Sequence, residues 1–182
     1  MSVSTLESSK TPQSKGPDFR KVGENLYRLN TSGGYYALLK RAGKQYRKSL
    51  KTTDKELAKR RLGELREKVG RLSTDKGIRN ITFAELSSRW MDIQKTKLKA
   101  SSATRNNVCV KALAPFFKSV TFKNINRSHC ENWLTKRGQG ISASSYKQER
   151  RILIAIFKYA ISLGIVLDNV AEEALPTRSI SS

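Results

Sequence analysis

The sequence has 182 residues, with 36 lysines and arginines against 15 aspartates and glutamates, a formal net charge of +21 and a pI near 10.3. No stretch reaches the roughly 18 apolar residues of a membrane-spanning helix, and the polar first twenty residues lack the apolar core of a secretory signal peptide. The hydrophobic fraction of 37% is too high, and too well patterned, for a wholly disordered chain. We therefore expect a cytoplasmic globular protein whose partner is a polyanion, with nucleic acid as the first candidate.

The positive charge is spread along the whole chain. Residues 18–75 carry 16 basic against 7 acidic side chains, and residues 76–182 carry 18 against 7. The sequence has no uninterrupted basic tract and no basic low-complexity repeat, so the charge is laid over folded elements. This pattern disfavours a non-specific packaging or ribosomal-type basic protein, which stays open as an alternative.

The two cysteines and the single histidine do not have the number or spacing of a metal-binding or reactive-thiol motif. Cys109 and Cys130 lack CxxC spacing and, with His129, cannot fill a four-ligand zinc site without carboxylates. We predict that both cysteines are reduced and behave as buried small hydrophobes. None of the six tyrosines has an obvious activating partner. We therefore predict no metal ion, no cofactor and no catalytic residue.

The first ordered region is predicted over residues 19–73, after a disordered leader at 1–18 that is rich in Ser, Thr, Pro, Gly and Lys. Residues 26–29 and 35–41 have the composition of strands. A short glycine-containing connection then leads to a third strand at 45–51, which makes a hairpin. The pattern predicts a three-stranded antiparallel sheet.

A helical period follows the strands. Thr53 and Glu56 have the S/T-x-x-E spacing of a capping box. Beyond them, apolar residues recur every three or four positions on an otherwise charged helix, at Ala58, Leu62, Leu65, Val69 and Leu72. Such a stripe needs burial, and the small sheet is the nearest apolar surface. We therefore predict one helix packed across one face of the sheet, with the other face left to solvent or to a partner.

A polar linker at 74–80 leads to a second region, 81–175, with four helical segments and no convincing strand. Candidate helix starts are a second capping box at Thr82 and Glu85, Ser101 or Ser102, Asn126 or Ser128, and Ser142. The fourth helix is apolar on more than one face, and Gly164 fits the position that ends it. We predict an antiparallel four-helix bundle followed by a tail at 176–182, and hence an α+β chain overall.

The predicted hairpin carries basic side chains suited to the major groove of DNA, which admits a two-stranded ribbon. The candidate contacts are Lys40, Arg41, Lys44, Gln45, Arg47 and Lys48. Strand alternation puts Gln45 and Arg47 on one face but Lys48 on the expected core side, so Lys48 would reach out at the sheet edge, or a bulge would change the parity. The alternative is that these charges only protect an exposed strand from aggregation.

Two helix starts in the bundle gather basic, hydroxyl and amide side chains. Free N–H groups and the helix dipole favour phosphate there, and Arg or Gln one turn further along can reach base edges. The candidate contacts are Thr104, Arg105 and Asn107 on the second helix, and Ser145, Lys147, Gln148 and Arg151 on the fourth. The alternative is an ordinary solvated face of a bundle.

Several short motifs resemble the phage-type integrases, the tyrosine recombinases. Those that resemble the amino-terminal arm-site-binding domain are Tyr36-Ala37, Gly43-Lys44, Arg47, Ser49-Leu50, Thr52, Asp54 and Ala58-Lys59-Arg60. Those that resemble the SAM-like core-binding domain are Ile81-Thr82-Phe83, Leu86, Trp90, Thr104, Ile125-Asn126, Ser142-x-x-Ser145, Phe157-x-x-Ala160 and Gly164-Ile165. The resemblance covers about residues 24–175. It departs from the family at Asn169-Val170, where Asn-Pro is usual.

The resemblance implies sequence-specific binding of double-stranded DNA during DNA integration and recombination. The implied partners are the arm and core sequences of an attachment site, other integrase protomers and accessory DNA-bending proteins, in the bacterial cytoplasm at the nucleoid. Family members also carry a carboxy-terminal catalytic domain with a nucleophilic tyrosine, and its motifs find no match in this sequence. We therefore expect the DNA-binding part of a recombinase without its catalytic domain, and no enzyme activity from this chain alone. A stand-alone DNA-binding regulator or integrase remnant is the alternative.

Overall fold

The computed structural model describes residues 18–41 and 43–177. The predicted leader and tail therefore lie almost wholly outside the described residues, as does Ala42 of the hairpin connection. Contacts between residues divide the chain into two compact units, Met1–Arg66 and Glu67–Ser182. The first unit holds a sheet and most of one helix, and the second holds a helical bundle. The expected α+β class is confirmed.

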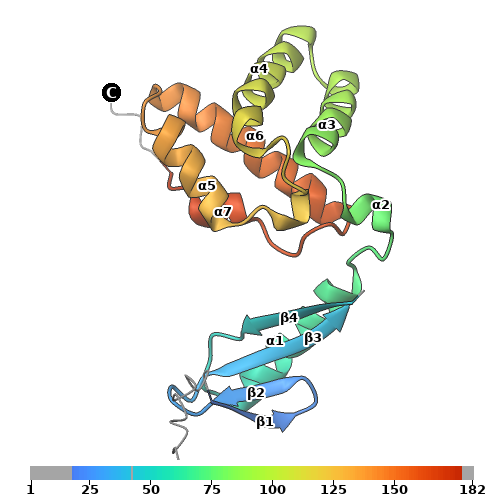
Figure 1. Ribbon diagram of the computed structural model, residues 1–182, viewed down its shortest axis with the longest axis vertical. Coiled ribbons are helices and arrows are strands. Elements are labelled where there is room, and N and C mark those ends of the chain that lie inside the picture. The colour runs from blue at the N-terminus through green and yellow to red at the C-terminus, as the bar shows by residue number, and fades with distance from the viewer. Residues whose placement is uncertain (1–17, 42, 178–182) are drawn as a thin grey trace, which may run out of the picture. The chain divides into compact units, whose positions relative to one another are not determined.

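The sheet of the first unit has four antiparallel strands in sequential order (Figure 1). They are β1 (Phe19–Gly23), β2 (Leu26–Leu29), β3 (Tyr35–Arg41) and β4 (Lys44–Ser49). The prediction of three strands was wrong by one, because β1 has the sequence FRKVG and its pairing shifts register between Lys21 and Gly23. That irregularity interrupts the period of two that identifies a strand in sequence.

The helix α1 (Lys55–Gly70) covers one face of this sheet (Figure 1). The core between them is made by side chains that are at most 7% exposed: Leu26, Tyr35, Ala37, Leu39, Leu50, Ala58, Leu62 and Leu65. Arg61 also donates from Nη1 to the carbonyl oxygens of Leu50 and Lys51, at 2.7 and 2.8 Å. The helix begins one residue later than the expected capping box, because Asp54 Oδ1 accepts from the backbone N–H of Leu57 at 2.6 Å.

The second unit contains more helical elements than the four predicted. They are α2 (Lys76–Arg79), α3 (Phe83–Lys97), α4 (Ala100–Phe117), the 3₁₀ turn η1 (Phe122–Asn124), α5 (Arg127–Trp133), the π-helical turn η2 (Leu134–Gly138), α6 (Ala143–Ser162) and α7 (Val170–Ala174). The predicted linker contains α2, because Asp75 Oδ1 accepts from the N–H groups of Gly77 and Ile78. The start of α4 was expected at Ser101 or Ser102 but follows Lys99, which makes no side-chain cap.

The other predicted helix starts are confirmed. Thr82 and Glu85 form a reciprocal capping box at α3, and Ser142 Oγ accepts from the Ser145 N–H at α6. Asn126 caps α5, where the side chain of His129 returns to the Asn126 backbone N–H. The single histidine is therefore occupied in a helix cap.

The centre of the bundle is α6, as its broad apolar surface predicts. Its residues Tyr146, Ile152, Leu153, Ile156, Phe157 and Ala160 are all fully buried. Phe157 packs on Phe122 with ring centroids 4.7 Å apart, and Tyr146 stacks on Trp133 at 5.5 Å. Cys109 and Cys130 are free and buried, as predicted. Across the two described ranges, no helix is both long and apolar enough to cross a membrane.

Candidate nucleic-acid interface

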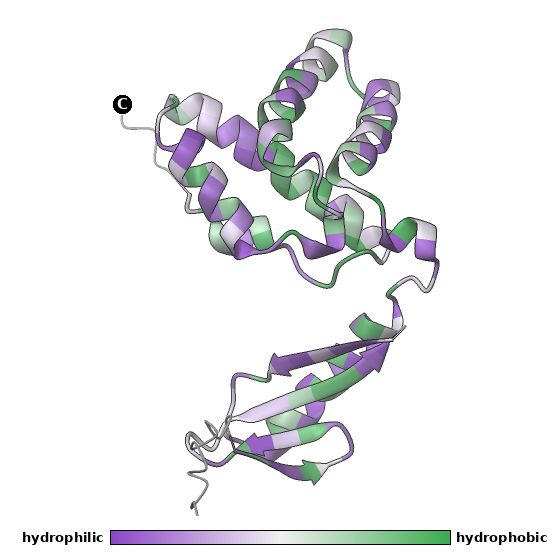
Figure 2. Cartoon of the chain, viewed as in Figure 1, coloured by the Kyte–Doolittle hydropathy of each residue, from purple (hydrophilic) through white to green (hydrophobic). Residues whose placement is uncertain are grey.

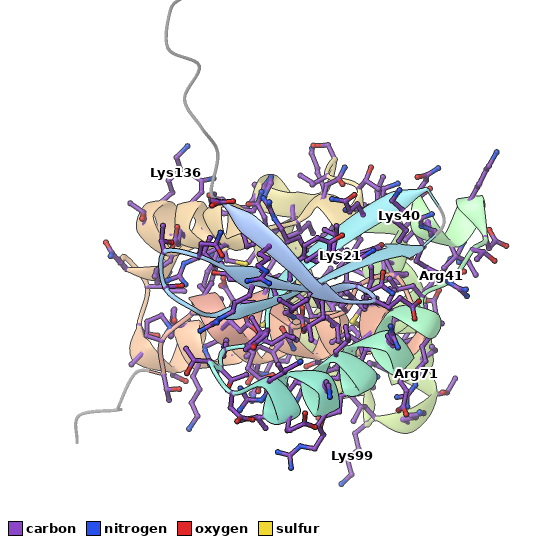
Figure 3. The ribbon with its side chains drawn as sticks, turned by 90° about the horizontal axis from the view of Figure 1, so that it is seen from below. Lys21, Lys40, Arg41, Arg71, Lys99 and Lys136 are labelled. Carbon is purple, nitrogen blue, oxygen red and sulfur yellow. The ribbon has the colours of Figure 1, made fainter. Side chains whose placement is uncertain are left out.

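One face of the sheet is not covered by α1, and we call it the open sheet face. The register pairs Tyr36 with Ser49, Leu38 with Arg47, and Lys40 with Gln45. The face is formed by Phe19, Lys21, Tyr27, Tyr36, Leu38, Lys40, Gln45, Arg47 and Ser49, which the strand pairings and alternation put on one side. Figure 3 shows Lys21 and Lys40 on their strands. Three of the six predicted hairpin contacts, Lys40, Gln45 and Arg47, therefore share this face.

The floor of the open sheet face is aromatic. Phe19 and Tyr36 meet edge to face with ring centroids 5.0 Å apart, and the Arg47 guanidinium lies 5.4 Å over the Phe19 ring. The two rings, with Tyr27 and Leu38, are partly exposed in a shallow hollow of about 130 Å³. An apolar floor bordered by cations suits a partner with flat apolar groups and phosphates.

The remaining three hairpin contacts lie on the face that α1 covers. Lys48 pairs with the fully buried Ala37 and is half-buried. Arg41 pairs with Lys44, whose ammonium lies 5.8 Å over the Tyr46 ring. The pairing of β3 with β4 is regular, so no bulge moves these side chains to the open face. In Figure 2, β4 is mostly hydrophilic, and β3 is hydrophobic in its middle and hydrophilic at its end.

In the bundle, the second and third turns of α4 and the start of α6 line a hollow of about 430 Å³, which we call the α4–α6 groove. Its lining residues are Arg105, Val108, Cys109, Arg137, Ser144, Ser145, Gln148 and Glu149. The groove brings together three predicted contacts, Arg105, Ser145 and Gln148, from two helices that are distant in the sequence. Ser144 and Ser145 are in the first turn of α6, where the helix dipole favours an anion, although the Ser145 N–H already donates to Ser142 Oγ.

An ion pair lies at one side of this groove. The Arg137 guanidinium donates from Nε and Nη2 to Glu149, at 3.0 Å to Oε2 and 2.7 Å to Oε1. The Glu149 side chain is 5% exposed and that of Arg137 36%. The hydrogen bond to Glu149 raises the pKa of Arg137. Burial, and secondarily the charge of Glu149, raises the pKa of the Cys109 thiol.

The sequence did not predict this pair, because the π-helical turn η2 carries no pattern that places it against α6. The position of Glu149 was the one available signal, since it is the acidic residue in a basic helix start. A carboxylate that folding buries needs a cationic partner.

Other predicted contacts of the bundle have different surroundings. Thr104 Oγ1 donates to the Ala100 carbonyl of its own helix at 3.0 Å, and Asn107 is exposed. Arg151 Nη2 donates to Oδ1 of the buried Asn106 at 3.1 Å, which ties α6 to α4. Lys147 is exposed, with no carboxylate partner among the described residues.

Lys147 and Arg151 border a second hollow, of about 390 Å³, along α6. Arg150 and Lys158 line it too, and sequence reasoning did not select Lys158 as a site residue. Arg150 Nε donates to the Leu175 carbonyl at 3.0 Å, and Tyr146 Oη donates to the Pro176 carbonyl at 2.8 Å. These bonds hold the chain after α7 against α6. The exposed side chains of Lys147, Arg151 and Lys158, which we call the α6 ridge, extend the positive surface.

No group of three or more His, Cys, Asp or Glu side chains within residues 18–41 and 43–177 is arranged to hold a metal ion. The chemistry available at both surfaces is therefore hydrogen bonding, cation–phosphate attraction and apolar contact.

The solved structures that resemble this chain include two of lambda integrase. A lambda integrase dimer bound to a COC′ core site has 18% sequence identity and a TM-score of 0.50, with 89% of this chain and 47% of that chain covered. A lambda integrase tetramer bound to a Holliday junction has 19% identity and a TM-score of 0.52, with 89% and 49% covered. The chain thus spans about half the length of these proteins. At this identity the likeness shows a shared fold.

A search of curated protein sequences found no match. The model of the phage integrase SAM-like domain, in contrast, matches residues 82–174, which is just over half of the chain and includes both sides of the α4–α6 groove. This match confirms the family resemblance predicted from the sequence. The chain belongs to the phage integrase SAM-like domain family, whose model covers its helical bundle.

Proposed function

We propose that this chain binds double-stranded DNA as the DNA-binding region of a site-specific tyrosine recombinase. The observation that carries the proposal is the α4–α6 groove, where the start of α6 and the second and third turns of α4 present base-reading and phosphate-binding groups side by side. The two similar structures are complexes of lambda integrase with a core site and with a Holliday junction. We assign strand cleavage and exchange to the catalytic domain of such a recombinase, and binding to this chain.

The side chains of the groove have the chemistry that DNA recognition needs. Arg105 can bond the O6 and N7 edge of guanine, and Gln148 the N6 and N7 edge of adenine. The first turn of α6 can bind phosphate through the backbone N–H groups that Ser142 does not cap. Glu149 does not oppose this, since Arg137 neutralises its charge.

The open sheet face is proposed as a second DNA-binding surface. Its exposed Lys21, Lys40 and Arg47 can bind phosphates around the aromatic floor, and Gln45 can bond a base edge. We propose that this domain, residues 19–73, binds arm-type sites, and that the bundle, residues 81–175, binds core sites. Residues 74–80 would connect them. Further integrase protomers and DNA-bending proteins are the proposed partners on the DNA.

The test compares Arg105→Ala with Lys111→Ala, which removes the same charge from α4 at an exposed position outside the groove. Duplexes are first selected by the chain from a random library, and Kd is then measured at several salt concentrations. For the unchanged chain, log K should fall with log salt by about 0.9 per phosphate neutralised. Arg105→Ala should weaken binding about tenfold or more, as loss of a bidentate base contact does.

Lys111→Ala should change Kd less than twofold under the same conditions. A Kd that does not depend on salt would contradict DNA binding by this chain. Equal losses for the two variants would show that the α4–α6 groove is not the binding surface.

A further inference from the structure

Val108 stands out among the apolar side chains of the described residues. Three large apolar side chains are exposed in that part of the chain, and Val108 is 61% exposed, against 37% for Leu98 and Ile161. Single exposed apolar residues are ordinary on protein surfaces. Val108 differs because it lines the α4–α6 groove with Arg105 and Gln148, where the neighbours are hydrogen-bonding groups.

The packing of α4 does not explain this valine. The buried side of the helix is formed by Ala103, Asn106, Cys109, Leu113 and Phe117. Val108 belongs neither to the buried residues of the hydrophobic core nor to the partly buried residues packed against it. A β-branched side chain also lowers helix propensity, because its χ1 freedom is restricted against the preceding turn. An apolar group of a molecule bound in the groove would explain why this exposed position is a valine.

We propose that Val108 contacts the 5-methyl group of a thymine, so that the α4–α6 groove recognises an A·T base pair. Thymine is the base that presents a methyl group in the major groove, and small apolar side chains contact it there. Gln148, on the opposite helix of the groove, has the amide that bonds the adenine of such a pair. The proposal rests on the proposed function, since it names the base that the same groove reads.

The charge of the groove favours DNA over an apolar protein segment as the occupant. Arg105 lies one helical turn before Val108 on the same face of α4, where the two side chains are neighbours. Arg105 carries no ion pair among the described residues, so its charge is available to a guanine or a phosphate. A protein segment apolar enough to cover Val108 would leave that charge uncompensated.

The test uses the full chain and duplexes that it selects from a random library. Each thymine of the strongest duplex whose binding Arg105→Ala weakens, and which therefore occupies the α4–α6 groove, is replaced in turn by uracil, which lacks only the 5-methyl group. At one or two positions the replacement should raise Kd about fourfold, the factor that corresponds to one methyl group removed from water. Val108→Ala should bind the thymine duplex about as weakly as the unchanged chain binds the uracil duplex, and should not distinguish the two.

Leu98→Ala is the matched control, since Leu98 is an exposed apolar residue outside the groove, and this variant should keep the preference for thymine. Circular dichroism should show unchanged helix content for both variants. If uracil has no effect at any position, or if Val108→Ala keeps the preference, the inference is wrong while DNA binding stands. If the library yields no enriched duplex and the chain does not bind DNA, the proposed function fails, and the inference with it.

Discussion

Glu149 shows how a single residue affects both the stability and the charge of the proposed DNA surface. Its carboxylate is almost completely buried beside a groove that we propose for a polyanion, and the bidentate pair with Arg137 satisfies it. Removing one partner of a buried ion pair is costly, because the other charge stays in a medium of low dielectric. The pair therefore gives a direct test of the groove's architecture.

Arg137→Ala should lower the free energy of unfolding by about 3 kcal/mol, the lower end of the usual range, because the Arg137 side chain is 36% exposed. Urea denaturation followed by circular dichroism measures the loss. The control is Arg127→Ala, which removes an i,i+4 pair with Glu131 whose side chains are 69% and 47% exposed and which should cost less than about 0.5 kcal/mol. Equal losses for the two variants would contradict a buried role for Glu149.

The two thiols should be poorly reactive in the folded protein. Burial raises the pKa of Cys130 to about 12, and it also raises the pKa of Cys109. Since the thiolate is the nucleophile, iodoacetamide at pH 8 should label Cys130 far more slowly in the native protein than in urea, as mass spectrometry of the two cysteine peptides would show. Equal rates in the two states would contradict the burial.

The raised pKa of Cys130 also has a consequence for stability at high pH. Between the ordinary thiol pKa of 9.0 and about 12, the unfolded chain loses this proton while the folded chain keeps it. The folded state then binds more protons, so the free energy of unfolding falls as the pH rises through this window. Below pH 9 both states keep the proton, so Cys130 contributes no pH dependence to the free energy of unfolding there.

Among the elements, the long and regular ones were predictable from sequence and the irregular ones were not. The stripe on α1 and the broad apolar surface of α6 have a clear helical period, and the caps at Thr82 and Ser142 carry local hydrogen bonds. β1 was not predicted because its register shift breaks the period of two. α2 was not predicted because four residues are too few to show a helical period.

In the candidate site, too, some residues were predictable from the sequence and others were not. Strand parity alone separates Arg47 from Lys48, and the observed register of β3 with β4 agrees. Lys21 was missed with its strand. Arg137 and Val108 were missed because their environment depends on how η2, α4 and α6 pack together, and no local pattern contains that information.

Gly164 ends α6 in a conformation that other residues resist. Its φ is +68°, and a Cβ there would lie 2.5 Å from the Arg71 carbonyl oxygen and 2.8 Å from the Ser73 nitrogen. Both are backbone atoms, so neither can rotate away. Gly164→Ala should therefore lower the free energy of unfolding by about 2 kcal/mol or more, measured by urea denaturation.

Gly63→Ala is the control, because it should have the opposite effect on the free energy of unfolding. Gly63 lies in the middle of α1, is exposed, and has open space around an added Cβ. Alanine there should raise the free energy of unfolding by about 0.5–1 kcal/mol through helix propensity alone. If Gly164→Ala were as harmless as Gly63→Ala, the tight turn after α6 would not be needed for stability.

At the scale of the whole molecule, the net charge of +21 is shared between two units of different construction. One presents an aromatic sheet face with a cationic border, and the other presents the α4–α6 groove and the α6 ridge. Surfaces so different in shape are expected to recognise different DNA sequences. Joined in one chain, they would bind two sites more tightly than either alone, because the second contact forms at a high effective concentration.

Because the two units are proposed to bind different sites, variants of the two units should act differently on short duplexes that are long enough for one site only. Arg47→Ala, on the open sheet face, should weaken one class of selected duplex about tenfold, and Arg105→Ala, in the α4–α6 groove, should weaken a different class by a similar factor. Lys55→Ala is the charge-matched control for the sheet, since it is exposed at the start of α1, the helix on the opposite face, and it should change neither class.

On a longer duplex that carries both sites, each single variant should cost less than it does on its own short duplex, because the intact unit holds the chain near the DNA. The double variant should lose this advantage and bind far more weakly than either single variant. Titrations of the four proteins against both short duplexes and the joined duplex measure this directly. If Arg47→Ala and Arg105→Ala weaken the same short duplex equally, the two surfaces form one continuous site, and the separate arm and core roles are wrong.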